Sequence, residues 1–190
     1  MDSHKEEAGI LIHSFAAAHA VIAFLLANTV IGDTVILTGL TYAMIEILGG
    51  IYEVKVSPAK IASRIFGLVA GTYLAGKLLF WVPGLGNWAN AASTIFVTET
   101  IGWTCVALFS TGKNPETISK EELSRVVDNA KKEAEKYKKE TKEVAEKMTS
   151  GEMEEVKNLS KQLRDKNISK VDRQAITQQL KGIYETAKKR

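Results

Sequence analysis

The chain has 190 residues, of which 45% are hydrophobic and 25% charged, with a formal net charge of +3 at pH 7. This length fits one domain, or one domain with an appendage. The single cysteine excludes an internal disulfide and a cysteine-rich metal site. Residues 1–110 hold five Lys/Arg and seven Asp/Glu, whereas residues 111–190 hold 20 and 15. We therefore expect an apolar helical module over residues 1–110 and a charged amphipathic helical tail over residues 111–190.

The apolar module begins with a long uncharged run. Residues 8–32 contain no Asp, Glu, Lys or Arg, and a helix needs about 20 apolar residues to cross a bilayer. Asp33 is placed as the N-cap of a second helix, which we expect to end near Tyr52. These two segments are thus candidates for membrane-embedded helices.

Two more apolar helices are expected before the tail. Ser57-Pro58 is typical of a helix start, and we expect this third helix to continue to Trp81. The segment Pro83-Gly84-Leu85-Gly86-Asn87 predicts a tight turn, because proline and two glycines do not continue a helix. A fourth helix should follow and end near Ser110. Short turns make successive helices antiparallel neighbours, so the module is predicted to be a four-helix bundle.

The tail is predicted to form three charged amphipathic helices. Ser119 with Glu122 reads as a capping box at the start of the first. Thr149-Ser150-Gly151 should break that helix, and Ser169 with Asp172 should open the last one. The apolar positions of the first tail helix follow a heptad seam, formed by Leu123, Val127, Ala130, Ala134, Tyr137, Thr141, Val144 and Met148. No strand-like alternation occurs, so the fold class is predicted to be all-α.

The distribution of basic residues favours a membrane location. If all four apolar helices cross a bilayer, Lys5, Lys55, Lys60, Arg64 and the tail lie on one side, and the turns on the other side carry no Lys or Arg. This positive-inside pattern predicts a membrane protein with both termini in the cytoplasm. The alternative is a soluble cytoplasmic domain, in which the same helices form an ordinary core.

Three charged residues lie inside the predicted spans, namely Glu46, Lys77 and Glu99. Each isolated charge costs about 2.5–3.5 kcal/mol at the centre of a membrane helix. They therefore suggest a polar network, which serves either as a proton or ion path or as a buried ion-pair cluster that fixes helix register.

Small residues in the third helix are expected to allow close helix packing. Gly67 and Gly71 have the small-xxx-small spacing, and Gly76 follows on the same helix.

The sequence gives no pattern typical of an enzyme. His13 and His19 are six residues apart, on different helix faces, so they form a poor metal pair. The glycines after Pro83 match a dinucleotide fingerprint only formally, since no strand precedes them. Acids and bases alternate in the tail, which favours a solvated face or a coiled-coil partner over nucleic acid. We expect no catalytic residues, cofactor or metal.

One family resemblance covers about residues 33–103. It is carried by Asp33, Leu40-Thr41-Tyr42-Ala43-Met44-Ile45, Ile51-Tyr52, Lys77, the segment Val82-Pro83-Gly84-Leu85-Gly86-Asn87-Trp88-Ala89-Asn90-Ala91, and Thr98-Glu99-Thr100-Ile101-Gly102-Trp103. This segment resembles the domain of unknown function six-nine-seven, a helical domain that follows Era-like GTPase domains or occurs in bacterial inner-membrane proteins. The resemblance implies a membrane-linked accessory domain and brings no catalytic residues. No GTPase domain precedes the segment here, so a nucleotide-driven function would need a partner chain.

These features lead to three hypotheses of function. The first is a non-enzymatic helical membrane protein that binds lipid and scaffolds or regulates a partner, such as a GTPase, or self-associates through its thin tail seam. The second is a channel, carrier or pore-forming protein that uses Glu46, Lys77 and Glu99. The third is a soluble helical domain that binds a lipid or another apolar ligand.

Overall fold

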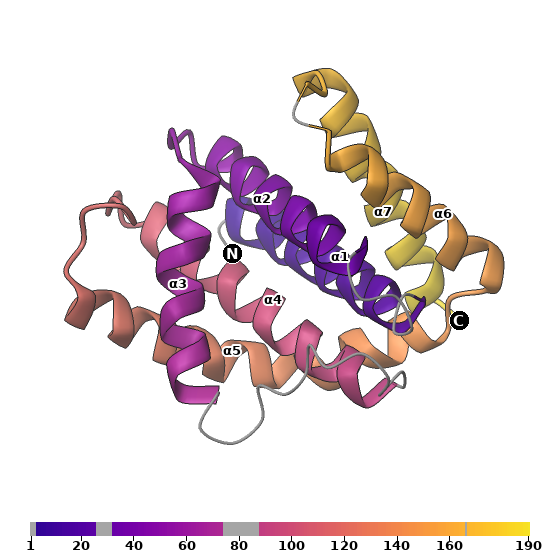
Figure 1. Ribbon diagram of the computed structural model, residues 1–190, viewed down its shortest axis with the longest axis horizontal. Coiled ribbons are helices and arrows are strands. Elements are labelled where there is room, and N and C mark those ends of the chain that lie inside the picture. Colours follow the sequence, from indigo (N-terminus) through magenta and orange to yellow (C-terminus); the bar gives the residue numbers. More distant parts are fainter. Residues whose placement is uncertain (1–2, 26–31, 74–87, 166) are drawn as a thin grey trace.

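The computed structural model describes residues 3–25, 32–73, 88–165 and 167–190 (Figure 1). These residues contain seven α-helices and no strand, which confirms the predicted all-α class. The helices are α1 (Ser3–Leu25), α2 (Gly32–Ile51), α3 (Pro58–Tyr73), α4 (Trp88–Phe109), α5 (Lys120–Glu146), α6 (Ser150–Leu163) and α7 (Lys170–Lys188).

The start signals of the tail helices are only partly as expected. Ser119 caps α5, since its side chain accepts a hydrogen bond from the Glu122 backbone N–H. The Glu122 carboxylate pairs with Lys113, so the expected capping box is half formed. The complete capping box lies at α6, where Thr149 and Glu152 each satisfy a backbone N–H of the other. The predicted break after α5 is thus also a helix start.

The other helix boundaries lie close to the expected positions. α7 begins after its predicted cap, Ser169, which accepts from the Asp172 backbone N–H. α2 begins at Gly32, one residue before the expected cap. The predicted end of the third helix and the turn at Pro83, Gly84, Gly86 and Asn87 lie outside the described residues.

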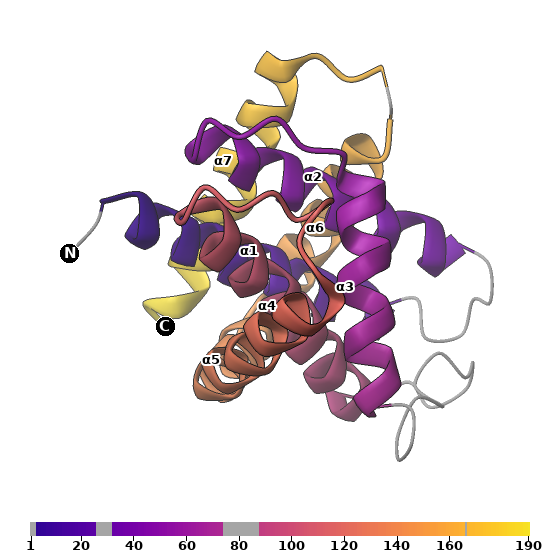
Figure 2. The ribbon, with the colours of Figure 1, turned by 90° about the vertical axis from the view of Figure 1, so that its left-hand side faces the viewer.

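One hydrophobic core joins the two compositional halves of the chain. It contains buried side chains from all seven helices, from Ala8 in α1 to Ala187 in α7. α1 lies at its centre and packs against α2, α4, α5, α6 and α7. Figures 1 and 2 show α4 and α5 on one side of α1, and α6 and α7 on another. The charged helices therefore complete the core of the apolar ones.

The heptad seam of α5 is covered within the chain. Leu123, Val127, Ala130, Ala134, Thr141, Val144 and Met148 are buried. Tyr137 is half-buried and packs against the same core. α5 packs mainly against α4 and also against α1. In this arrangement α1 and α4 cover the seam, and the expected use of the seam by a partner chain stays a prediction.

Close helix packing occurs at a glycine other than the predicted one. Gly67 is exposed, and a Cβ atom there would meet nothing within 4 Å, so its expected packing role is not observed. A Cβ on Gly102 would lie 2.6 Å from Cγ1 of Ile12, so α4 approaches α1 closely at this point. The surroundings of Gly71 and Gly76 lie outside the described part of the chain.

Two of the described helices are long and apolar enough to cross a membrane. They are α1 and the segment Ala91–Phe109 of α4. In each of them, 72% of the residues of an apolar 18-residue stretch are buried inside the fold. The apolar segment Ile36–Ile51 of α2 is shorter. Buried helices of soluble proteins can be equally long and apolar. In this fold both helices are covered mainly by their neighbours, and α5 lies against both.

Candidate functional site

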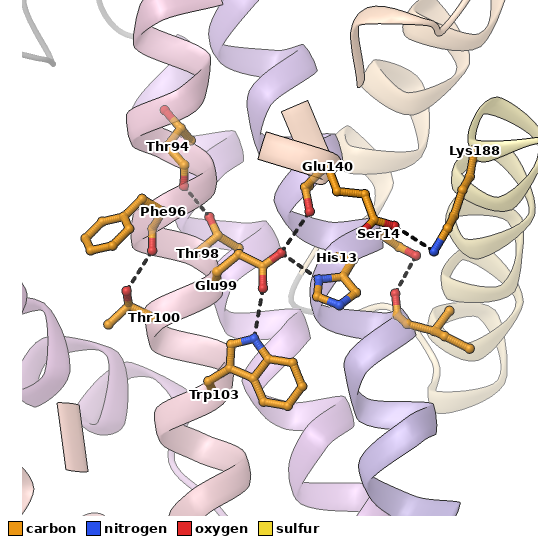
Figure 3. A network of polar contacts seen from close by, with 12 residues as sticks. His13, Ser14, Thr94, Phe96, Thr98, Glu99, Thr100, Trp103, Glu140 and Lys188 are labelled. Atoms are coloured by element: carbon orange, nitrogen blue, oxygen red, sulfur yellow. Dashed lines mark hydrogen bonds and ion pairs between the residues drawn. The ribbon is translucent and has the colours of Figure 1, made fainter. Parts of the chain in front are cut away.

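The most unusual polar group of the described structure is the Glu99 carboxylate in α4. The residue is completely buried. Its Oε1 lies 2.7 Å from Nδ1 of His13 in α1 and 3.2 Å from the Thr141 hydroxyl of α5, which donates to it. Its Oε2 accepts a 3.0 Å hydrogen bond from Nε1 of Trp103, one turn further along α4 (Figure 3). Three helices thus converge on one carboxylate.

This geometry compensates for the cost of burying a carboxylate. An unpaired carboxylate in a protein interior is strongly unfavourable, and it persists only with a counter-charge and hydrogen-bond donors. With Nδ1 protonated, His13 donates to Glu99, and it is also a counter-charge when Nε2 carries a proton as well. Trp103 and Thr141 provide two further donors. We call these four residues, His13, Glu99, Trp103 and Thr141, the Glu99 cluster.

Aromatic rings enclose the His13 side of the cluster. The centroid of the His13 ring lies 4.5 Å from that of Tyr137, 6.0 Å from that of Trp103 and 6.4 Å from that of Tyr184. The His13 side chain is 14% exposed. Since Tyr137 belongs to α5 and Tyr184 to α7, the tail helices shield the histidine from water and make the site a junction of four helices.

A second ion pair lies at the outer edge of this junction. Glu140 of α5 lies 2.8 Å from Nζ of Lys188 in α7, and both side chains are about half exposed. The bond to Lys188 lowers the pKa of Glu140, and the bond to Glu140 raises the pKa of Lys188. Burial, with the charges of Glu140 and Glu99, raises the pKa of Tyr184. The phenol therefore stays neutral beside the two carboxylates.

The polar groups of α1 and α4 are mostly satisfied within their own helices. The Thr98 and Thr100 hydroxyls donate to the carbonyls of Thr94 and Phe96, and the Ser14 hydroxyl donates to the carbonyl of Ile10 (Figure 3). The Thr104 hydroxyl likewise donates to the Thr100 carbonyl. His19 Nδ1 lies 2.7 Å from the Phe15 carbonyl, and its Nε2 lies 3.1 Å from the Thr41 hydroxyl of α2. Polar side chains bonded in this way add little demand for partners outside the helix.

The predicted polar network is not brought together by these contacts. Glu46 is 51% exposed at its side chain and pairs with Arg173 of α7, whereas Glu99 is buried against His13. Lys77 lies outside the described residues. The partner of Glu99 was missed because 86 residues separate it from His13, and no spacing rule connects them. The one signal in the sequence is that His13 and Glu99 both lie in apolar segments, where a polar side chain needs a hydrogen-bond partner.

The site has the chemistry of a structural connection. Both oxygens of Glu99 are engaged by donors, which leaves them poorly placed to bind a substrate. No group of three or more His, Cys, Asp or Glu residues is positioned to hold a metal ion in the described part of the chain. An open hollow of about 560 Å³ at the end of α6 is lined by Lys161, Gln162, Arg164, Asp165 and Asn167. All five lining residues among those described are polar or charged, and no cluster of apolar side chains is found among them.

Comparisons with protein-family models, curated proteins and solved structures found no match to this chain.

Proposed function

We propose that this chain is a non-enzymatic helical membrane protein with a closed form, in which the charged helices α5–α7 cover the two membrane-length helices α1 and α4. The observation that carries the proposal is the shared core. Both apolar helices are largely buried, and α5 lies against both of them. Helices of this length and apolar composition also fit the hydrocarbon layer of a bilayer, so a bilayer can take the place of the protein core around them.

The closed form and a membrane-spanning form exclude each other. α5 packs along α4, and its outer side carries exposed lysines such as Lys132, Lys136 and Lys139. Three such charges in hydrocarbon would cost roughly 9 kcal/mol, at about 3 kcal/mol each. This is comparable to the whole stability of a typical domain, about 5–15 kcal/mol. α5 therefore has to leave α4 before α4 enters a bilayer.

Release of the tail gives the protein a way to act on a partner. In the closed form the α5 seam is buried against α1 and α4. In the inserted form the seam is uncovered at the membrane surface and available to a protein partner or to a second copy of this chain. On this proposal the protein is a scaffold or regulator, and the resemblance described above makes a GTPase one candidate partner.

The other two hypotheses gain less support. A channel or carrier that uses Glu46 with Glu99 is not favoured, because the two carboxylates have different partners on different helices. An apolar-ligand carrier is not favoured by the polar hollow at the end of α6.

Membrane association of the full chain tests the proposal. The purified protein is incubated with vesicles of phosphatidylcholine and phosphatidylglycerol, floated, and washed with alkaline carbonate. We expect part of the protein to float and resist the wash. Thr141→Val removes the hydrogen bond from α5 to Glu99 and should raise the resistant fraction. Thr177→Val is the matched control, since that buried hydroxyl bonds only one turn back along α7, to the Arg173 carbonyl. Complete recovery of all three proteins in the wash would contradict membrane insertion.

A further inference from the structure

The two membrane-length helices form a closely fitted pair that runs in opposite directions. Gly9 faces Trp103, Ile12 faces Gly102, and His13 faces Glu99, so rising numbers in α1 meet falling numbers in α4. The close approach at Gly102 leaves no room for a lipid chain or another side chain between the helices there. The pair is therefore a packed unit in the closed form.

Many hydrogen bonds of this pair are internal, but His19 Nε2 of α1 lies 3.1 Å from the Leu37 carbonyl and 3.1 Å from the Thr41 hydroxyl of α2. Glu99 has one donor in α1, one in α4 and one in α5, and the bond from α5 is the longest of the three. The hydroxyls of Thr98, Thr100 and Thr104 in α4 and of Ser14 in α1 donate to carbonyls of their own helices. Removal of the tail therefore costs Glu99 only the Thr141 bond. Buried polar groups that keep their partners are the ones that hydrocarbon tolerates.

The membrane-length segments of the pair contain a single carboxylate, and its partner also lies within the pair. Residues 8–25 contain no Asp, Glu, Lys or Arg, and residues 91–109 contain only Glu99. His13 of α1 lies 2.7 Å from this carboxylate, so the pair of helices carries its own partner for Glu99. If α4 entered hydrocarbon alone, it would carry an unpaired carboxylate, which is costly.

From these observations, and resting on the proposed function, we infer that α1 and α4 enter the lipid bilayer together as one antiparallel pair joined by the His13–Glu99 bond, while α5–α7 remain in water. The antiparallel arrangement places the start of α1 and the end of α4 at the same membrane surface. The end of α1 and the start of α4 then lie at the opposite surface. α2 and α3 either cross as a hairpin, which keeps the contact between His19 and α2, or stay outside and lose it. The occupant of the surface that the tail vacates is lipid.

Trp103 and the backbone amides together report which helices enter. Trp81→Phe with Trp88→Phe leaves Trp103 as the single tryptophan. In floated vesicles with brominated acyl chains, we expect at least a twofold loss of Trp103 fluorescence. Hydrogen exchange on the same vesicle-bound protein should slow in α1 and α4 and accelerate in α5–α7, relative to the closed form in buffer.

The outcomes separate this inference from the proposed function. Absence of flotation removes the proposed function and the inference with it. Flotation with unquenched Trp103, or with slowed exchange in α1 but not in α4, leaves a membrane protein and refutes paired insertion. Slowed exchange in α5–α7 as well would show that the whole closed form binds the surface, which also refutes it.

Variants at the bond itself test whether it joins the pair. His13→Leu removes the α1 donor to the carboxylate in both forms. Because an unpaired carboxylate costs more in hydrocarbon than inside the closed fold, α4 insertion, measured by Trp103 quenching, should fall roughly tenfold. Glu99→Gln keeps an acceptor for Trp103 and a polar group for His13, and should insert within about twofold of the wild type. Ser14→Ala, which removes a hydroxyl bonded within α1, is the matched control. Wild-type quenching in His13→Leu would overturn the assignment, and so would a tenfold loss in folded Glu99→Gln.

Discussion

Replacement of His13 by leucine is expected to destabilise the closed fold strongly. Leucine fills a similar volume but removes the donor that lies 2.7 Å from a completely buried carboxylate oxygen. Breaking a buried pair from one side costs about 3–5 kcal/mol. Since Trp103 and Thr141 still donate to Glu99, we expect the lower end, about 3 kcal/mol. In a chain of this length, that corresponds to a fall in Tm of about 6–12 °C.

The measurement is equilibrium unfolding in urea at pH 7 without detergent, followed by circular dichroism. The matched variant is His13→Leu combined with Glu99→Leu. Replacing both members of a buried pair by apolar side chains is often neutral or stabilising, so the double variant should unfold at higher urea than the single one. A loss below about 1 kcal/mol in His13→Leu would show that Glu99 does not depend on the histidine. A double variant no more stable than the single one would refute the argument about the buried charge.

Three further predictions concern packing, capping and charge. Gly102→Ala should lower the free energy of unfolding by about 1–3 kcal/mol, because its Cβ would lie 2.6 Å from a side chain of α1. Gly67→Ala is the control: its Cβ would meet nothing within 4 Å, so this variant should be neutral or stabilising by up to about 1 kcal/mol. Thr149→Ala should cost about 1 kcal/mol in urea unfolding, since it removes the N-cap of α6; an unchanged midpoint would exclude a capping contribution. The pair between Glu140 and Lys188 lowers the pKa of the acid and raises that of the base, so its stabilisation is lost as pH falls through the lowered pKa and as pH rises through the raised one. Lys188→Gln should therefore lower the free energy of unfolding by about 0.5 kcal/mol at pH 7. At pH 2.5 its urea midpoint should lie close to that of the wild type. An equal loss of stability at both pH values would contradict this pH dependence.

Local features of the fold could be predicted from the sequence because their signals are local. Ser169 caps α7 as expected, since a capping side chain and the N–H that it accepts from lie three residues apart. The period of the α5 seam correctly identified a buried helix face, because side chains at these spacings share one side of a helix. What covers that face could not be predicted, since period alone does not distinguish a partner chain from α1 and α4 of the same chain.

The candidate site depends on contacts between distant segments, and these lack a local signal. Gly67 has the spacing of a packing glycine, yet the close approach occurs at Gly102, because the crossing point of two helices is decided by their partners. Glu46 and Glu99 looked alike in sequence, as acids in apolar helices. Their surroundings differ because Glu46 pairs with Arg173 of α7, whereas Glu99 contacts His13 of α1.

The central position of α1 has a consequence for how the protein is made. α1 is translated before the helices that enclose it, and its last neighbour, α7, begins at Lys170. At ordinary rates of synthesis the ribosome needs on the order of 10 s to reach α7. During that time the apolar helix α1, which is long enough to span a membrane, cannot yet be buried in the completed core. On the proposed function, the location of α1 then depends on whether the chain is completed before a targeting factor or a bilayer binds this helix. Slower translation of the second half should therefore favour the membrane.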